Sequence, residues 1–395
     1  MDLRRVGGAA LAVLCMRLVF GVLALPISAF FPRTTIELQI PLTPGVAPLG
    51  EWLQRTFLMP WMRYDAWQYF LIADHGYILQ DNTAHLHPLY PLLTMLVAPL
   101  GGGNIILALL LVSTLSCVAL CVVLARYTER FYDAKLANRT AWLLLLLPPG
   151  FILLAPYTES TFLALAVGSL FAMRVERWWL AGLLGGLATL TRQHGVALAL
   201  PLAWGLLVAI RAGRARWWDG AALALVPLSY GAFIFYRAVA LGGVQALTQA
   251  RGPVELVQAI LVAPAGLPAG QRIAWPWELL LDQLALIRMS TVNYHLVIDL
   301  LLGWALVIAV LLGLRRMHPL ERLYAIAVVM LGLCYYIVEI DPYMALPRHI
   351  MLAFPLYITL AARSGHGQRL GLIVIGALLV NLFLAGLYFF GGWIP

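Results

Sequence analysis

The chain has 395 residues, of which 62% are hydrophobic and only 11% charged, and its mean hydropathy is +0.88. Soluble domains carry about 25% charged residues, so the composition excludes a soluble globular protein and indicates a polytopic membrane protein. The net charge of +8 does not indicate a nucleic-acid partner, because the arginines recur in short clusters between apolar runs and form no single patch.

Apolar runs long enough for membrane helices occupy most of the sequence. The first, residues 6–31, is longer than the roughly 7–15 apolar residues of a cleaved signal peptide, which favours a retained signal anchor. The four cysteines lie within apolar runs, which favours buried thiols over disulfides or a zinc site. The later runs are residues 87–100, 104–125, 140–155, 158–173, 178–190, 196–210, 221–241, 295–314, 320–338, 350–362 and 370–390.

Charge predicts the orientation of these runs. Six polar segments hold sixteen of the 26 basic residues but only six of the 18 acidic ones, so we assign them to the cytoplasm by the positive-inside rule. They are the N-terminus and residues 126–139, 174–177, 211–219, 315–322 and 363–369. The outer side then receives residues 32–86, 156–159, 191–195, 242–294 and 339–349.

This orientation allows one net crossing between residues 86 and 126, where two apolar runs lie. Residues 87–100 would be about 21 Å long as a helix, and three glycines separate them from the next run. They therefore fit a short embedded helix on the outer side, which leaves about eleven spans. Twelve spans are the alternative if charge is the weaker guide.

Two of the outer segments are far longer than turns. In the first, residues 32–86, tryptophan, phenylalanine and leucine alternate with charged and amide side chains over residues 51–73. This mixture predicts one or two amphipathic helices lying in the membrane interface and broken at Pro60. The second, residues 242–294, contains glycine and proline throughout, so we expect a mostly irregular loop with short helices.

Asp65 lies between Tyr64 and Trp67 in the first outer loop. A partly desolvated carboxylate beside the outer leaflet suits a general base that acts on a hydroxyl group. The alternative is an interfacial acid that pairs with Arg63 or remains in solvent.

For three further acidic or histidine residues, a structural interpretation has the same weight as substrate binding. Asp74 and His75 precede Gly76, so they form either a second polar cluster or the end of a helix capped by glycine. Glu159 opens an apolar run after Tyr157. It therefore either binds substrate or stabilises the positive end of a helix dipole.

Basic residues stand at two predicted outer turns, where the positive-inside rule disfavours them. These are Arg192 with His194, and Arg348 with His349. Such pairs suit a lipid phosphate group, and the alternative for the second pair is an ion pair with Glu339 or Asp341. Two further charges, Arg17 and Asp299, lie within apolar runs and should face the bundle interior.

Four ordered motifs resemble the PIG-V-type mannosyltransferases, which are the GPI mannosyltransferase II family and its prokaryotic relatives in the GT-C superfamily. They are YDAWQYFLIADHGY (64–77) with HPLYPLL (87–93), APYTES (155–160), WWLAGLLGGLATLTR (178–192) and PRHIMLAFPL (347–356). The sequence departs from the family pattern at Tyr64, where the family has tryptophan. It also departs at Leu86-His87 in place of Phe-Phe, and at Gln193-His194 in place of Pro-Thr.

The resemblance implies a single all-α GT-C transmembrane domain over residues 1–395, with the catalytic helices in residues 32–86. It implies transfer of mannose, with inversion, from a polyprenyl-phosphate carrier to a hydroxyl of a lipid-linked or glycan acceptor on the outer face of the bilayer. Asp65 would be the base, and Arg348 with Arg192 would hold the phosphate. The other motif positions that would bind substrate are Tyr64, Trp67, Asp74, His75, His87, Tyr90, Tyr157, Glu159, His194 and His349.

No P-loop, dinucleotide-binding turn or paired metal-carboxylate motif occurs, so we expect no nucleotide donor, no metal and no cofactor. A lipid or solute transporter is the alternative function, although its charges would lie near the midplane within repeated helices. A non-catalytic scaffold of the same fold is a third possibility. The single lysine, Lys135, among 26 basic residues indicates a GC-rich prokaryotic genome, and thus a plasma membrane without a GPI acceptor.

Overall fold

The computed structural model describes residues 3–30, 48–78, 81, 83–240, 252, 272–289, 294–336, 339–365 and 368–391. Within these ranges, secondary structure is helical except for a two-residue antiparallel ribbon formed by β1 (Arg272–Ile273) and β2 (Tyr335–Tyr336). The predicted all-α architecture is therefore confirmed. The chain divides into two compact units.

Six segments in the described part of the chain are long and apolar enough to cross a membrane, which makes the chain a multi-pass integral membrane protein. The predicted number of about eleven spans is not confirmed, because several apolar runs form helices shorter than the roughly 17 residues that a span needs. The short helix expected over residues 87–100 is present. The six segments are Val6–Ile27, Ile105–Phe131, Gln193–Arg211, Trp217–Arg237, Tyr294–Arg316 and Leu370–Phe389.

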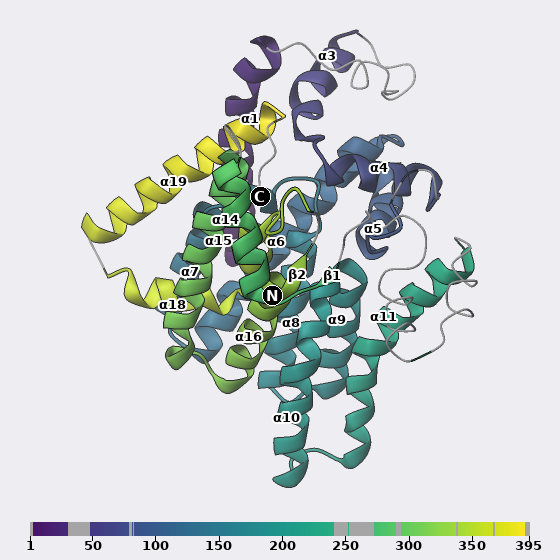
Figure 1. Cartoon of the computed structure of the whole chain (residues 1–395), viewed down its shortest axis with the longest axis vertical. Helices are drawn as coiled ribbons and strands as arrows, with labels where there is room; N and C mark the ends of the chain where they lie inside the picture. Colours follow the sequence, from purple (N-terminus) through teal and green to yellow (C-terminus); the bar gives the residue numbers. More distant parts are fainter. Residues whose placement is uncertain are drawn as a thin grey trace. The chain divides into compact units, whose positions relative to one another are not determined.

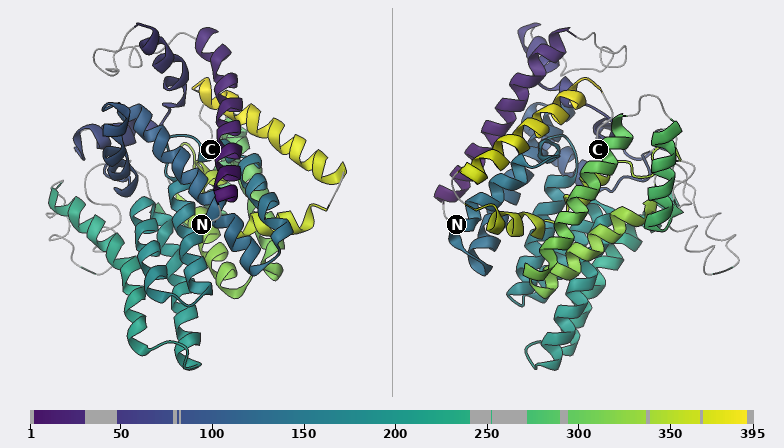
Figure 2. Two further views of the ribbon diagram at one scale, coloured as in Figure 1. Left: turned by 180° about the vertical axis from the view of Figure 1, so that it is seen from behind. Right: turned by 60° about the vertical axis from the view of Figure 1, so that its left-hand side comes forward.

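Unit 1 comprises Met1–Asp74, Tyr90–Ala164 and Leu360–Ile394. Helix α1 packs on α6 and α19, and α6 packs on α7; Figure 2 shows α1 and α19 side by side. The helices of this unit are α1 (Leu3–Phe30), α3 (Pro48–Phe57), η1 (Met59–Trp61), α4 (Asp65–His75), α5 (Leu89–Val97), η3 (Ala98–Gly101), α6 (Ile105–Phe131), α7 (Ala134–Leu146), η4 (Gly150–Leu153) and α19 (Gln368–Phe389).

Polar side chains tie the helices of unit 1 together. The Arg17 guanidinium of α1 donates to the Leu154 carbonyl at 2.6 Å and lies 4.9 Å from the centre of the Trp61 ring. The expectation that Arg17 faces the bundle interior is thus confirmed. Asn381 of α19 accepts from the Phe151 amide at 3.0 Å and donates to the Leu145 carbonyl at 3.1 Å.

The predicted break in the first outer loop is confirmed. Pro60 lies in the 3-10 turn η1, which separates α3 from α4. Helix α3 exposes Trp52 and Phe57, as a helix at a membrane interface would. Residues 32–47 of this loop lie outside the described residues.

Unit 2 comprises His75–Leu89 and Leu165–Thr359, with the last residue of the chain. Helices α9, α10 and α11 run side by side (Figures 1 and 2). Helices α8 and α18 of this unit also contribute residues to unit 1. The helices of unit 2 are α8 (Glu159–Arg174), α9 (Trp178–Thr191), η5 (Gln193–Leu198), α10 (Ala199–Arg211), η6 (Trp217–Gly220), α11 (Ala221–Ala240), α14 (Pro276–Met289), α15 (Tyr294–Gly313), η7 (Leu314–Arg316), α16 (Pro319–Cys334), α17 (Leu346–Ile350) and α18 (Pro355–Arg363).

Glycines allow α9 and α11 to approach closely. A Cβ atom at Gly182 would lie 2.2 Å from the Ala222 carbonyl oxygen, and one at Gly186 would lie 2.6 Å from the Ser229 hydroxyl. Small residues spaced by about one helical turn permit such contacts between membrane helices. The glycines of the third sequence motif therefore form a packing seam.

The charge predicted to face the interior of α15 does so. Asp299 is fully buried and interacts with Asp341, whose carboxylate accepts a hydrogen bond from Gln283 of α14 at 3.2 Å. Burial raises the pKa of Asp341 to about 6, so this pair holds a shared proton more readily than two exposed carboxyl groups. Helix α14 and β1 are the part of the second outer loop that is described; residues 242–251, 253–271 and 290–293 lie outside it.

Candidate active site

Asp65 is the first residue of α4 and is partly exposed. The preceding residue, Tyr64, has a left-handed backbone conformation with φ of 47°, so the chain turns sharply just before the helix begins. The positive end of a helix dipole favours the ionised form of a carboxylate at this position.

Two tyrosine hydroxyl groups hold the chain before Asp65. Tyr157 donates to the Arg63 carbonyl at 3.0 Å, and Tyr388 donates to the Trp61 carbonyl at 2.7 Å. Both tyrosines are buried. The second sequence motif, which contains Tyr157, thus contacts the turn that presents Asp65.

Side chains of the same turn also donate hydrogen bonds to main-chain oxygens at the end of α19 and just beyond it. The Arg63 guanidinium donates to the Phe389 carbonyl at 2.9 Å, and the Tyr64 hydroxyl donates to the Gly391 carbonyl at 2.7 Å. These contacts connect residues more than 300 positions apart in the chain, so no local pattern in the sequence could have predicted them.

The other predicted residues of unit 1 lie in different surroundings. Glu159 is fully buried as the first residue of α8, and Trp67 is half-buried against Phe70. Tyr90 is fully buried, and its hydroxyl donates to the Leu109 carbonyl at 2.8 Å. The observed role of Tyr90 is to fix α5 on α6, and its substrate contact stays a prediction.

The Asp74-His75 pair has the geometry of a helix end. Helix α4 ends at His75, and Gly76 follows with φ of 81°, the left-handed conformation of a glycine C-cap. His75 pairs with Asp81, with 3.4 Å between its Nε2 and a carboxylate oxygen, at a partly exposed position. His75 therefore has a structural role at the end of α4, and substrate binding by Asp74 and His75 remains a prediction.

In unit 2, the turn between α9 and α10 presents two of the predicted residues. Arg192 ends α9 in an extended conformation, and His194 is 2% exposed in η5. A Cβ atom at Gly195 would lie 2.3 Å from the Thr189 amide nitrogen, so only glycine permits this tight turn. Neither ring nitrogen of His194 has a hydrogen-bond partner among the described residues.

The fourth sequence motif meets this turn. Arg348 and His349 lie in α17 and are 8% and 7% exposed, after a left-handed turn at Ala345 with φ of 57°. The rings of His194 and His349 are 4.8 Å apart between centroids and nearly perpendicular. Arg192 and Arg348 both act electrostatically on these two histidines. The structure therefore brings together the two basic pairs that the sequence singled out.

His87 belongs to the same cluster. Its Nδ1 lies 2.6 Å from the Thr189 carbonyl oxygen, and because a carbonyl can only accept, Nδ1 carries the proton and Nε2 is left with a lone pair. Its ring stacks on Tyr230. Burial, together with the charges of Arg237 and Arg192, lowers the pKa of His87 to about 3, so this ring is neutral at physiological pH.

Sequence reasoning missed Arg237. This residue lies near the end of α11, is 4% exposed, and its guanidinium is 5.3 Å from the centre of the Phe233 ring. Its Nε and Nη2 atoms have no hydrogen-bond partner within the described residues. An arginine at the predicted outer end of an apolar run was the available signal, since the positive-inside rule disfavours it there.

We call the six residues His87, Arg192, His194, Arg237, Arg348 and His349 the basic cluster. Its arginines act electrostatically on its histidines, and the histidines act on one another. Burial, followed by His194, Arg192 and Arg348, lowers the pKa of His349 well below its usual value. Three guanidinium groups beside imidazoles suit an anion with several oxygen atoms, such as a phosphate. Within the described residues, no group of three or more His, Cys, Asp or Glu side chains is suited to hold a metal ion.

Comparisons with known proteins give partial sequence matches and one match of fold. No protein-family model matches the chain. The chain is 32% identical over 151 residues to GPI alpha-1,6-mannosyltransferase 2 of Cricetulus griseus, which covers 34% of the chain and 29% of that relative. It is 34% identical over 101 residues to GPI mannosyltransferase 2 of Yarrowia lipolytica, which covers 25% of the chain and 28% of that relative. The matches thus span about a third of these relatives.

The crystal structure of ArnT from Cupriavidus metallidurans bound to undecaprenyl phosphate is similar over 92% of this chain and 63% of that one. The TM-score is 0.50 and the sequence identity 15%, so this match concerns the fold alone. It confirms the GT-C-type fold that the motifs implied. The chain therefore has a GT-C-type fold and, over a quarter to a third of its length, is similar in sequence to GPI mannosyltransferase 2.

Proposed function

We propose that the chain is a membrane-embedded, inverting mannosyltransferase that uses a polyprenyl-phosphate-mannose donor. Its acceptor is a hydroxyl group of a lipid-linked or glycan molecule. Two lines of support come from the comparisons, since the sequence relatives are mannosyltransferases and the solved protein of similar fold is bound to a polyprenyl phosphate. The basic cluster is the observation that carries the proposal, because three arginines with neutral histidines suit a lipid phosphate.

In the proposed reaction, Asp65 accepts the proton of the acceptor hydroxyl. The hydroxyl oxygen attacks C1 of mannose, and the bond between C1 and the phosphate oxygen breaks, with its electron pair leaving on the phosphate. Negative charge grows on that phosphate in the transition state, so fixed guanidinium groups at Arg348, Arg192 and Arg237 lower the barrier as well as bind the donor. Tyr64 and Trp67 offer aromatic faces for a sugar ring.

The test is incubation of the purified protein with radiolabelled polyprenyl-phosphate mannose and a lipid extract of its host. We expect label to move into an acceptor and unlabelled polyprenyl phosphate to accumulate. Label that stays on the donor with wild-type protein, in an extract that contains acceptors for other mannosyltransferases, would contradict the proposal. A polyprenyl-phosphate donor with a different hexose in a parallel reaction distinguishes a different donor sugar from a different reaction.

We further propose that the protein lies in a prokaryotic plasma membrane with Asp65 and the basic cluster on the outer face. The excess of arginine in the segments assigned to the cytoplasm supports this orientation. A cysteine introduced at Lys135, in the first turn of α7, should react only with reagents applied from the cytoplasmic side. Labelling from the outside would show that the chain has the opposite orientation to the one proposed.

A further inference from the structure

A pocket lies at the other end of α9 from the basic cluster. Its volume is about 280 Å³, and its walls come from the C-terminal ends of α8 and α10, the first residue of α9 and the start of α16. Helix α9 has 14 residues, so the two ends lie about 21 Å apart. By the distribution of charge in the sequence, the pocket is at the predicted cytoplasmic end of unit 2.

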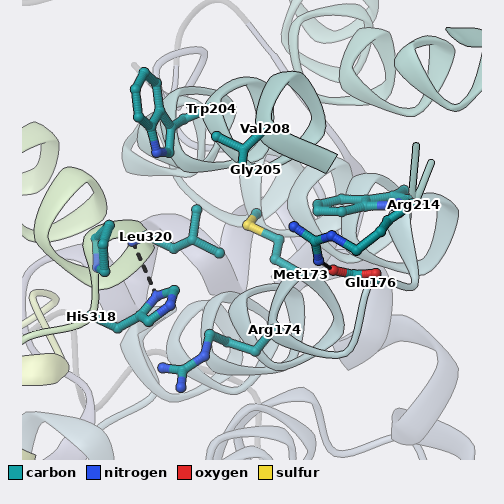
Figure 3. Close-up of a pocket in the computed structure, with 11 residues that line it drawn as sticks. Met173, Arg174, Glu176, Trp204, Gly205, Val208, Arg214, His318 and Leu320 are labelled. Carbon is teal, nitrogen blue, oxygen red and sulfur yellow. Dashed lines mark hydrogen bonds and ion pairs between the residues drawn. The ribbon is translucent and has the colours of Figure 1, made fainter. Parts of the chain in front are cut away.

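Two arginines line this pocket, each fixed by a carboxylate. Arg174 donates to Glu321 at 3.0 Å, and Glu321 is fully buried. Arg214 pairs with Glu176 and is half-exposed. Figure 3 shows Arg174 next to His318 on one side of the pocket and Arg214 with Glu176 on another. The guanidinium groups are therefore held at the pocket, where they can meet an anion.

Two uncharged side chains of the pocket, those of His318 and Trp178, add hydrogen-bond donors. The Nδ1 atom of His318 accepts from the Leu320 amide at 3.3 Å, so the proton of the neutral ring is on Nε2. Burial, and then the charge of Arg174, lowers the pKa of His318 to about 4, which keeps the ring neutral. Trp178 is 6% exposed and lines the pocket, and its Nε1–H has no hydrogen-bond partner among the described residues. An indole N–H can only donate, so the pocket contains a buried donor that lacks an acceptor.

The turn that carries Glu176 is built at a conformational cost. The Glu176 amide donates to the Met173 carbonyl at 3.1 Å and the Arg177 amide to the Ala172 carbonyl at 2.9 Å. This is the Schellman pattern, in which glycine usually takes the left-handed position. Glu176 takes it with φ of 58°. A non-glycine residue in this conformation points to a use for its side chain, and here that use is to fix Arg214.

The surface beside the pocket is apolar. Helix α10 exposes Leu200, Trp204, Leu207 and Val208, each between 40% and 49% exposed. Their spacing of four, seven and eight residues places them on one face of the helix. Trp204 and Val208 also line the pocket. A path of apolar side chains thus leads away from the polar site along the direction in which a lipid chain would run.

We propose that this pocket binds the phosphodiester headgroup of an anionic membrane lipid, whose acyl chains lie along the exposed face of α10. The volume fits a headgroup and not a whole lipid. Glu176 offsets part of the charge of Arg214, which favours the single negative charge of a phosphodiester over the double charge of a free phosphate. The segments 174–177, 211–219 and 315–322 hold eight arginines and three carboxylates, and such a field concentrates anionic lipid at a membrane surface.

Native mass spectrometry of the full chain in phosphatidylcholine nanodiscs tests the proposal. Short-chain phosphatidylglycerol is titrated, with phosphatidylcholine of the same chain length, glycerophosphoglycerol and inorganic phosphate as parallel ligands. We expect saturable binding of one phosphatidylglycerol, weaker binding of the phosphodiester glycerophosphoglycerol, and no competition by inorganic phosphate at equal concentration. Equal affinity for phosphatidylcholine, or full competition by inorganic phosphate, would overturn the assignment to an anionic lipid.

Arg214→Gln is the informative variant, since Arg214 is half-exposed and its loss leaves Glu176 in contact with solvent. We expect at least about tenfold weaker phosphatidylglycerol binding, the loss expected for a hydrogen bond to a charged group. Arg211→Gln, in the same polar segment but outside the pocket lining, is the matched control. Trp204→Ala should weaken binding of the lipid but not of glycerophosphoglycerol. Equal affinity in wild type and Arg214→Gln would overturn the proposal. Mannosyl transfer is not the readout, so failure here leaves the proposed function untouched.

Discussion

Replacement of Asp65 by asparagine is the sharpest test of the proposed chemistry. Asparagine has nearly the same shape and can still occupy the first turn of α4, so the turn held by Tyr157 and Tyr388 should persist. The variant loses the charge that favours a helix N-terminus, which is worth about 0.3–1 kcal/mol. General-base catalysis contributes about 10²–10⁴-fold, or roughly 2.7–5.4 kcal/mol of activation free energy. Loss of stability is thus too small to mimic loss of the base.

The assay therefore measures turnover at saturating donor, donor affinity and melting temperature on the same preparations. We expect turnover to fall by about 10²–10⁴-fold, with donor affinity near that of wild type. Asp282→Asn in α14 is a matched isosteric control with no expected change in turnover. Glu159→Gln should act mainly through binding or folding, because Glu159 is fully buried. Turnover of Asp65→Asn within a few-fold of wild type would refute the mechanism.

Three further predictions concern the basic cluster and the helix seam. Arg348→Lys keeps the charge but loses the planar fork, so donor affinity should fall about tenfold; unchanged affinity in a titration would remove Arg348 from the phosphate site. The pKa of His87 is lowered to about 3 from 6.5, so the unfolded state binds more protons between these values. The contribution of His87 to the free energy of unfolding is complete above pH 6.5 and falls by about 1.4 kcal/mol per pH unit as the pH drops from 6.5 to about 3. Melting curves of His87→Gln should therefore show a weaker pH dependence than those of wild type. Gly182→Ala should cost about 1–3 kcal/mol by overpacking α9 against α11, whereas a Cβ at Gly231 meets nothing within 4 Å and Gly231→Ala should melt near wild type.

Charges and prolines were the parts of the sequence that predicted structure well. The cost of an unpaired charge in a membrane is large, so Arg17 and Asp299 had to face the interior, and they do. Pro60 interrupts the amphipathic segment because it cannot continue the hydrogen bonding of a helix. The positive-inside rule singled out Arg192 and Arg348, because both stand where it disfavours arginine, and the structure joins them through His194 and His349.

What the sequence could not predict depends on contacts between distant segments. Arg237 looked like the end of an apolar run, and its importance appears only when His87 and Phe233 are seen beside it. The support of Asp65 by the end of α19 involves main-chain oxygens, which leave no mark in the sequence. The predicted number of spans is not confirmed, because apolar length along the sequence ignores the 3-10 turns and caps that shorten the helices.

The turn before Asp65 also bears on how this site can vary among relatives. Tyr64 stands where the family pattern has tryptophan, and its hydroxyl donates to the Gly391 carbonyl. A tryptophan also has a flat ring with a single donor near its edge. The position thus requires an aromatic ring that reaches a main-chain oxygen, and either residue meets that requirement. Because the acceptor is a backbone atom, exchange between the two needs no compensating mutation, so drift at this position can occur while the carboxylate of Asp65 stays in place.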